Sequence, residues 1–373
     1  IARHTPARGL VAAGRAATSR SMRNELRLLR PDRLTGRDLA AWSRLQEADP
    51  AFASPFLRPE FAQAVGAVRD DVFVAAIGPE DSPQAFLGFQ ARGRNGLPLG
   101  GGLSDCQAIV AAPGWRWDGA ALVRALGLAR LDMTRLVVAR GGVVPARGRL
   151  VAAPLIRLGD GFEAYARARR AAGSQAVVQT LSHARRLERA LGPLRFVPHD
   201  PDPRMLHRLI AWKRAQYALP RWGGALDPLA RPWAVALLER VQATQAPGFA
   251  GMLSTLWAGE TLVAAHLGLR SRSLLHWWFP AHDPAQAKLA PGRILLLEAI
   301  RHAAQAGLSG IDLGAGEEGY KRRFADAEVA LVAGAVGPAS WWCRATDAAA
   351  GLARRMPPAA EWMFRREWHR LHR

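Results

Sequence analysis

Cysteine and lysine are both scarce in this chain of 373 residues. Cys106 and Cys343 are the only cysteines, so a disulfide framework, a zinc ribbon and an iron–sulfur cluster are excluded. So few thiols are typical of a reducing compartment. Lysine occurs only at positions 213, 288 and 321, although lysine and arginine together number 51. Basic content that is almost entirely arginine, in a chain rich in alanine and glycine, indicates a GC-rich genome.

Long apolar runs are also missing, since none approaches the roughly 20 residues that a membrane-spanning helix needs. Hydrophobic residues make up 49% of the chain and charged residues 22%, which is typical of a globular protein. A length of 373 residues predicts two domains, at roughly 100–200 residues each. The net charge of +20 leaves RNA, phospholipid or another polyanion open as a partner.

Several catalytic signatures do not occur. We find no G-x-S-x-G of a serine hydrolase, no H-x-x-x-D acyltransferase signature and no cluster with metal-ligand spacing. Gly314-Ala-Gly316-Glu-Glu-Gly319 spells G-x-G-x-x-G after a predicted strand. No βαβ partner follows it, and two glutamates would face the pyrophosphate, so we interpret it as a tight turn.

Hydrophobic patterning predicts the same α/β layout twice. The first copy has a strand at 71–77, a hairpin over 84–99 turning at Asn95-Gly96, a strand at 107–111, a helix at 118–130 and a strand at 135–139. The second has strands at 251–257, 261–269 and 274–279, a helix at 292–306 and a strand at 310–313. Equivalent elements lie about 175–177 positions apart, which predicts two related halves, each with a mixed sheet and not a doubly wound one.

Chemistry-bearing residues gather in the second half. His266 lies within an apolar strand, where an imidazole needs a partner, and His276 and Trp278 share one face of the next strand. Ala290, Pro291, Gly292 and Arg293 open a long helix, and a helix start of this kind favours an anion. Further candidates end the next strand or follow it: Asp312, Glu318, Tyr320, Lys321 and Phe324.

These residues carry a resemblance to a known family. The runs L-V-A-A-H-L-G-L-R (262–270), H-W-W-F-P-A-H-D-P (276–284), A-P-G-R-I-L-L-L-E (290–298) and I-D-L-G-A-G-E-E-G-Y-K-R-R-F (311–324) resemble the GNAT-superfamily acyltransferases of the CelD/BcsL cellulose-biosynthesis group. That group is related to the Fem-type aminoacyl transferases. The likeness is sharp over about 250–325 and looser from about 155. Ala287 and Ala290 stand where the usual GNAT pyrophosphate loop has Gln or Arg and Gly.

The resemblance implies a tandem GNAT-like α/β fold with mixed sheets. We expect residues 1–21, before Met22, to be a disordered or non-native extension. The composition of this extension resembles that of a transit peptide. An N-terminal GNAT-like domain at 22–155, an acyltransferase domain at 156–338 and basic, Trp-rich helices at 339–373 then follow. On the last helix, Phe364, Trp368 and Leu371 form an apolar stripe that would dock on the sheet or on an anionic membrane.

Three functions follow as hypotheses. The first is acyl transfer from acyl-CoA or a similar thioester to an envelope or exopolysaccharide acceptor, in the cytoplasm or at the inner membrane face, without a metal. In this hypothesis His266 or Asp312 is the general base. Tyr320 would protonate the leaving thiolate or position the acceptor, and Lys321 would stabilise the developing negative charge. The segment Ala290 to Arg293 would hold the donor, and the acceptor would contact His276, Trp278, Glu318 and Phe324. The second is transfer from aminoacyl-tRNA, with phosphates bound by Arg167, Arg169, Arg170, Arg185, Arg186 and Arg189. The third is a scaffold without catalysis.

Overall fold

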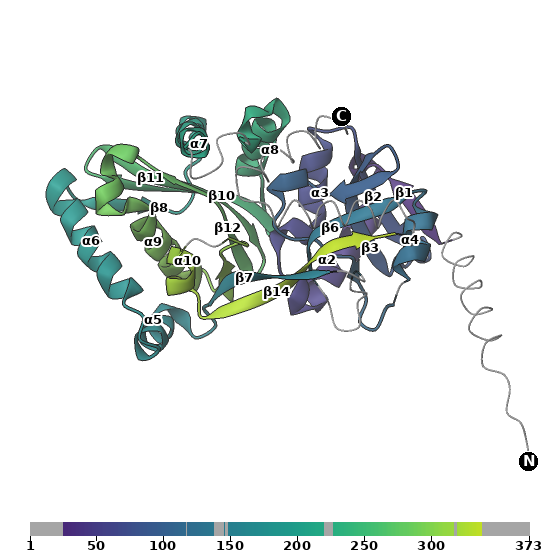
Figure 1. Ribbon diagram of the computed structural model, residues 1–373, viewed down its shortest axis with the longest axis horizontal. Coiled ribbons are helices and arrows are strands. Elements are labelled where there is room, and N and C mark those ends of the chain that lie inside the picture. Colours follow the sequence, from purple (N-terminus) through teal and green to yellow (C-terminus); the bar gives the residue numbers. More distant parts are fainter. Residues whose placement is uncertain are drawn as a thin grey trace, which may run out of the picture.

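Among the residues that the structure describes, fourteen strands form one mixed sheet that runs through both halves of the chain (Figure 1). The chain is described here from a computed structural model, which covers residues 25–337 apart from 117, 138–144, 146–147, 220–226 and 317–318. The expected extension at 1–21 and the expected helices at 339–373 therefore lie outside the described residues. Along the sheet the strands follow the order β1-β2-β3-β4-β6-β14-β7-β13-β12-β11-β10-β8.

The strands of the sheet have these bounds: β1 (Leu26–Leu29), β2 (Val72–Ile77), β3 (Ala85–Arg92), β4 (Asn95–Pro98), β5 (Val110–Ala111), β6 (Arg130–Val137), β7 (Arg149–Arg157), β8 (Leu194–Val197), β9 (Gln245–Ala246), β10 (Phe249–Ala258), β11 (Thr261–Ser271), β12 (Leu274–His282), β13 (Gly310–Asp312) and β14 (Ala327–Val336). Only β4–β6 and β12–β13 are parallel among the named neighbours, and the other named pairs are antiparallel.

Helices cover both faces of the sheet. They are α2 (Gly36–Ala48), α3 (Pro59–Gly66), α4 (Gly119–Ala125), α5 (Gly161–Ala171), α6 (Ala176–Leu191), α7 (Pro203–Tyr217), α8 (Pro232–Ala243), α9 (Pro291–Gln305) and α10 (Gly319–Phe324). One core joins α2, α3, α7 and α8 across the two halves, and we call that side the shared face. On the opposite face, α4 covers the first half, while α5, α6 and α9 cover the second.

Strand pairing repeats in the two halves, as the sequence offset predicts. Strands β2, β3 and β4 form an antiparallel run, and α4 then leads to β6, which is parallel to β4. In the same way β10, β11 and β12 run antiparallel before α9 leads to β13, parallel to β12. The predicted fold class, mixed α/β with two related units, is confirmed.

The last strand of each half pairs with the other half. Strand β7 follows β6 in the chain, yet it pairs with β13 and β14. Strand β14 follows β13, yet it pairs with β6 as well as with β7. Figure 1 shows the two strands running together across the middle of the molecule. This exchange makes the sheet continuous, and the predicted boundary at 155/156 falls inside β7.

Two local predictions need correction. The first hairpin turns at Gly93-Arg94, because Arg92 pairs with Asn95, so Asn95-Gly96 lies in β4 and not in the turn. Gly96 packs closely there, since a Cβ would lie 2.6 Å from a methyl carbon of Leu131. The predicted helix 118–130 and strand 135–139 are also displaced: α4 ends at Ala125 and β6 already begins at Arg130.

Candidate functional site

Strands β12 and β13 separate at His276 and Asp312. They pair over only three residues each, and His276 opposite Asp312 is the last pair. Strand β12 then continues to His282, whereas β13 ends at Asp312. The site is therefore at a point where the parallel pair opens, between the end of one strand and the continuation of its neighbour.

The imidazole of His276 lies between two carboxylates. Its Nε2 atom is 3.0 Å from Oδ2 of Asp105, and its Nδ1 atom is 3.4 Å from Oδ2 of Asp312. Asp312 also accepts a hydrogen bond of 2.8 Å from the N–H of Gly314 through Oδ1. His276 has no exposed surface, and Asp312 is 6% exposed. The first half contributes Asp105 and the second half contributes the other two residues, so both halves build this cluster.

Two cations surround the cluster. Nη1 of Arg135 lies 2.8 Å from Oδ1 of Asp105 and donates to the carbonyl of Ser104. Lys321 is buried and directs its Nζ at the carbonyl of Gly314, 3.5 Å away. Burial by itself raises the pKa of Asp105. The hydrogen bond from His276 and the charges of His276, Arg135 and Lys321 together outweigh burial, so the pKa of Asp105 lies below its usual value.

His276 is an imidazolium at neutral pH. Burial alone lowers its pKa, but the charge of Asp312 and the hydrogen bonds and charge of the two carboxylates raise the pKa to about 9. The protonated ring therefore cannot accept a proton near pH 7. Asp312 is the group of this cluster that also opens onto a large groove.

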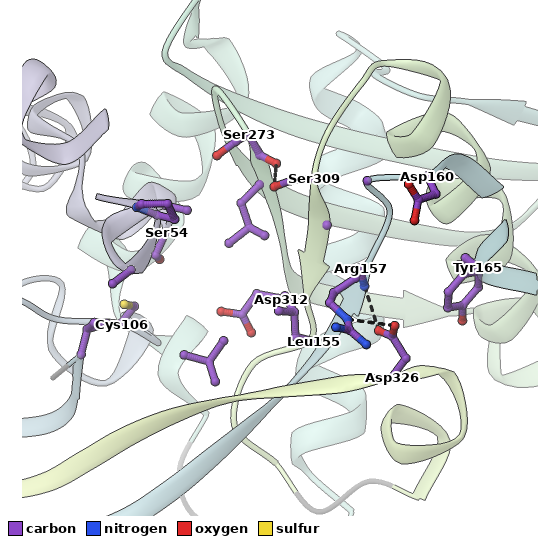
Figure 2. A pocket seen from close by; sticks show the side chains of 18 of the residues that line it. Ser54, Cys106, Leu155, Arg157, Asp160, Tyr165, Ser273, Ser309, Asp312 and Asp326 are labelled. Atoms are coloured by element: carbon purple, nitrogen blue, oxygen red, sulfur yellow. Dashed lines mark hydrogen bonds and ion pairs between the residues drawn. The ribbon is translucent and has the colours of Figure 1, made fainter. Parts of the chain in front are cut away.

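The groove lies on the shared face of β13, β7 and β14 and has a volume of about 910 Å³. Its polar lining residues are Glu47, Ser54, Arg157, Asp160, Tyr165, Ser273, Ser309, Asp312 and Asp326, and its larger aliphatic ones are Val137, Leu155, Leu274, Val329 and Leu331. Figure 2 shows Asp312 between the Cys106 side and the Arg157–Asp326 ion pair. Both halves line this groove, so an acceptor bound there would lie against Asp312.

The start of α9 keeps the backbone geometry of a glycine loop. Ala290 has φ 54°, in the left-handed region that favours glycine, although the residue is alanine. No side chain caps this helix start, and Gly292 leaves room for a ligand to approach its backbone. Arg293 lies near Arg186 and His183 of α6: burial, followed by the charges of these two arginines, lowers the pKa of His183. The residues here fit a phosphate-bearing donor.

The structure separates His266 from the cluster around His276. Its ring stacks on Trp277 at 3.7 Å on the opposite face, and its Nε2 accepts the backbone N–H of Trp278 at 3.2 Å. A register shift between Leu267 and Leu269 marks a bulge beside this contact. Burial, and then the charges of His276 and Lys213, holds the pKa of His266 well below its usual value. His266 is placed to satisfy the backbone at the bulge.

The other predicted residues are distributed as follows. Trp278 lies on the shared face, where its Nε1 donates to the carbonyl of Leu103 at 2.7 Å. Phe324 is buried in the core under α9, and Tyr320 packs against the same core. Lys321 joins the His276 cluster, as described above. Glu318 lies outside the described residues.

Sequence reasoning missed Asp105 and Arg135. Both lie in the first half, about 140–170 positions before His276, so no spacing rule connects them with it. The available signal was weak: an acid beside a cysteine, after the glycine-rich run 100–102. Among the described residues, no group of three or more His, Cys, Asp or Glu side chains could hold a metal ion.

One protein-family model matches part of the chain. Residues 175–322 match the sequence model of the acetyltransferase (GNAT) domain. That segment contains His276, Asp312, Lys321 and the start of α9. No curated protein sequence matches the chain significantly.

The chain is similar to the C-terminal domain of a putative lysylphosphatidylglycerol synthetase from Agrobacterium fabrum, with a TM-score of 0.50 and 12% identity over 83% of this chain and 94% of that one. It also aligns with a tandem GNAT protein of clavulanic acid biosynthesis (TM-score 0.43, 11% identity, 85% and 100% covered) and with FemX (0.46, 8%, 82% and 95%). Residues 175–322 are thus similar to a GNAT acetyltransferase domain, and this match supports an enzyme of the acyltransferase class.

Proposed function

We propose that the enzyme transfers an acyl group from an acyl thioester, acyl-CoA above all, to an amino group of an acceptor held in the groove. One observation carries this proposal: Asp312 ends β13 where β12 and β13 separate, and it lines the groove on the shared face. The carboxylate therefore stands between the gap in the sheet and the space for an acceptor.

The donor would bind with its phosphates at the start of α9. The uncapped amides and the helix dipole favour negative charge, and Arg293 and Lys288 add two cations beside them. The backbone of Ala290 supports this assignment despite the altered loop sequence, because its left-handed conformation is the one that a glycine there would supply.

Acid–base chemistry would centre on Asp312. An acceptor bound as an ammonium first releases one proton to water. Its neutral nitrogen then attacks the thioester carbonyl and the C–N bond forms, the second nitrogen proton passes to Asp312, and the C–S bond breaks. The imidazolium of His276 and the N–H of Gly314 hold the carboxylate in place. Lys321 would balance the negative charge on the carbonyl oxygen, and Tyr320, its neighbour on α10, is the proposed proton donor to the thiolate.

The charge of the groove favours an amine over a hydroxyl as acceptor. Four carboxylates line it, from Glu47, Asp160, Asp312 and Asp326. Cations pair with three of them: Arg58 and Arg272 with Glu47, His276 with Asp312, and Arg157 with Asp326. Asp160, just before α5, has none of these pairings, and its carboxylate would attract the ammonium form of an amine.

Donor binding is tested by isothermal titration of the full chain with acetyl-CoA and longer acyl-CoAs. We expect Arg293→Ala to weaken binding about tenfold and to reduce its salt dependence. Arg301→Ala is the matched control, because Arg301 lies two turns further along α9 in an ion pair with Glu298. Absence of binding by every thioester would refute the proposal.

Acceptor chemistry is tested with pairs that differ in one group, such as a hexosamine and the corresponding hexose. We expect acyl transfer to the amine only, and a loss of about a hundredfold or more in kcat/KM for Asp312→Asn. Equal transfer to both acceptors would contradict the assignment to amines. The resemblance to the cellulose-biosynthesis group favours an envelope or exopolysaccharide amino sugar within this class.

Aminoacyl-tRNA is the second candidate donor. Arg167, Arg170, Arg185, Arg186 and Arg189 are exposed on α5 and α6, which pack against each other. Such a basic surface would neutralise phosphates, so tRNA binding should weaken steeply with salt. A gel shift with total tRNA at two salt concentrations tests this, and an unchanged mobility excludes the tRNA donor.

Membrane contact remains a proposal that concerns the C-terminal residues. None of the described helices is long and apolar enough to cross a bilayer. The proposed surface helix with Phe364, Trp368 and Leu371 lies outside the described residues. Sedimentation with anionic liposomes tests it, and equal pelleting of the full chain and a truncation at Met356 would refute the contact.

A further inference from the structure

We propose that Asp105 is a positioning residue of the acyl-transfer site, contributed by the first half to hold His276 with Nδ1 facing Asp312 and with its proton in place. The proposal rests on the proposed function in one respect, namely that Asp312 is the proton acceptor. Asp105 belongs to none of the motifs that the sequence predicted to be functional.

Asp105 and Asp312 contact opposite edges of one ring. The Nε2 atom of His276 lies 3.0 Å from Asp105, and Nδ1 lies 3.4 Å from Asp312. Rotating the ring by half a turn would place carbon atoms against both carboxylates, so the two contacts together define one orientation. Phe56 packs edge-on against the ring at 4.8 Å, which limits its tilt.

The backbone after β13 closes over this pair. Gly314 has φ 70°, and a Cβ at this position would lie 2.8 Å from Oδ2 of Asp105 and 3.3 Å from Cε1 of His276. The same residue donates its N–H to Asp312 and offers its carbonyl to Lys321. One short segment of backbone therefore donates a hydrogen bond to Asp312 and packs closely against Asp105.

Asp105 also decides the charge balance around the ring. The groups that face His276 or Asp105 are Asp312, Arg135 and Lys321, with the thiol of Cys106 and the ring of His266 close by. Burial raises the pKa of Cys106 to about 12 and lowers that of His266, so both are neutral at pH 7. Without the charge of Asp105, one carboxylate would face His276, Arg135 and Lys321, and the imidazolium would lose its proton at lower pH.

The first experiment measures the ring itself. Imidazole nitrogen NMR signals of the full chain are followed from pH 5 to 10, and His276 is assigned from the spectrum of His276→Gln. In the wild type we expect its titration near pH 9. Asp105→Asn should move that titration down by about one pH unit or more. Asp132→Asn, which removes a carboxylate paired with Arg130 on β6, is the matched control and should leave it unchanged.

The second experiment measures acyl transfer over the same pH range. The alkaline limb of kcat/KM should shift to lower pH in Asp105→Asn and coincide with the wild type in Asp132→Asn. An unchanged His276 titration in Asp105→Asn would overturn the proposal, and so would a shifted titration with an unchanged pH profile. Should the wild type transfer no acyl group, the proposed function fails, and the NMR titration still decides whether Asp105 sets the charge of His276.

A third variant separates charge from shape and serves if Asp105→Asn does not fold. Asp105→Glu keeps the carboxylate, so the titration of His276 should stay near its wild-type position, with most of the activity restored. A glutamate variant as impaired in both readouts as the asparagine variant would overturn the proposal.

Discussion

The stability of the protein should fall between pH 6.5 and 9 because of one buried ring. His276 has no exposed surface and binds its proton more tightly in the folded chain, where its pKa is about 9, than in the unfolded chain, where it is near 6.5. Below pH 6.5 both states hold the proton, and the ion pairs contribute fully. As the pH rises, the unfolded chain releases its proton first, so the free energy of unfolding decreases until the folded ring also titrates.

The size of this effect follows from the shift in pKa. Each unit of difference corresponds to about 1.4 kcal/mol, so the contribution lost between pH 6.5 and 9 is about 3 kcal/mol. His276→Gln removes the titrating group, and its free energy of unfolding should lack this decrease. The difference between the wild type and the variant should therefore shrink by that amount as the pH rises.

Urea unfolding at half-unit steps from pH 6 to 9 measures the difference. The remaining histidines are common to both proteins and cancel in the subtraction. Burial raises the pKa of the Cys106 thiol to about 12, so this thiol begins to lower stability only as the unfolded thiol titrates near pH 9, and it also cancels in the subtraction because both proteins contain it. Parallel pH dependences in the two proteins would refute the assignment of a buried imidazolium.

Three further substitutions test the geometry around the site. Gly268→Ala should destabilise the fold by about 1–3 kcal/mol in urea unfolding, because the new Cβ would lie 2.4 Å from Cε1 of His266. Gly36→Ala is the control: its Cβ would meet nothing within 4 Å, so the variant should be as stable as the wild type. Ala290→Gly should stabilise it by about 1 kcal/mol, since it relieves a left-handed alanine; a lower melting temperature would contradict this. Trp278→Phe leaves the carbonyl of Leu103 without its 2.7 Å hydrogen bond and should destabilise the fold by about 1–3 kcal/mol. A variant as stable as the wild type would show that this hydrogen bond between the two halves is dispensable.

The sequence predicted the repeat because local patterns define each half. The ends of α9 and of the strands β10, β11 and β12 lie within three residues of the predicted ends, because their apolar runs are long and the helix has clear start and stop signals. Strands β7 and β14 were not predicted at all. Pro154 interrupts the first, and the second pairs with strands about 170–205 positions away, so neither shows its partner in the sequence.

The candidate site was accessible from the sequence only in its second half. His276, Asp312 and Lys321 lie in consecutive motifs, so their grouping could be predicted, although the structure alone shows that His276 is the charged ring and Asp312 the open carboxylate. His266 looked like a base because it is an imidazole in an apolar strand. The bulge at Gly268, which gives that imidazole a backbone partner, depends on the register of two strands and has no signature of its own.

The exchange of β7 and β14 has a consequence for biosynthesis. A ribosome releases β6 long before β14, so the edge of β6 that β14 finally covers stays unpaired while nearly 200 residues are added. An exposed strand edge of this kind can recruit a strand from another nascent chain. Folding to the functional state is then a late event that waits for the C-terminal strand, and a chain stopped before Ala327 would leave the first half without its closing partner. Pulse-labelled chains should gain protease resistance in one step after β14 emerges, and not in two.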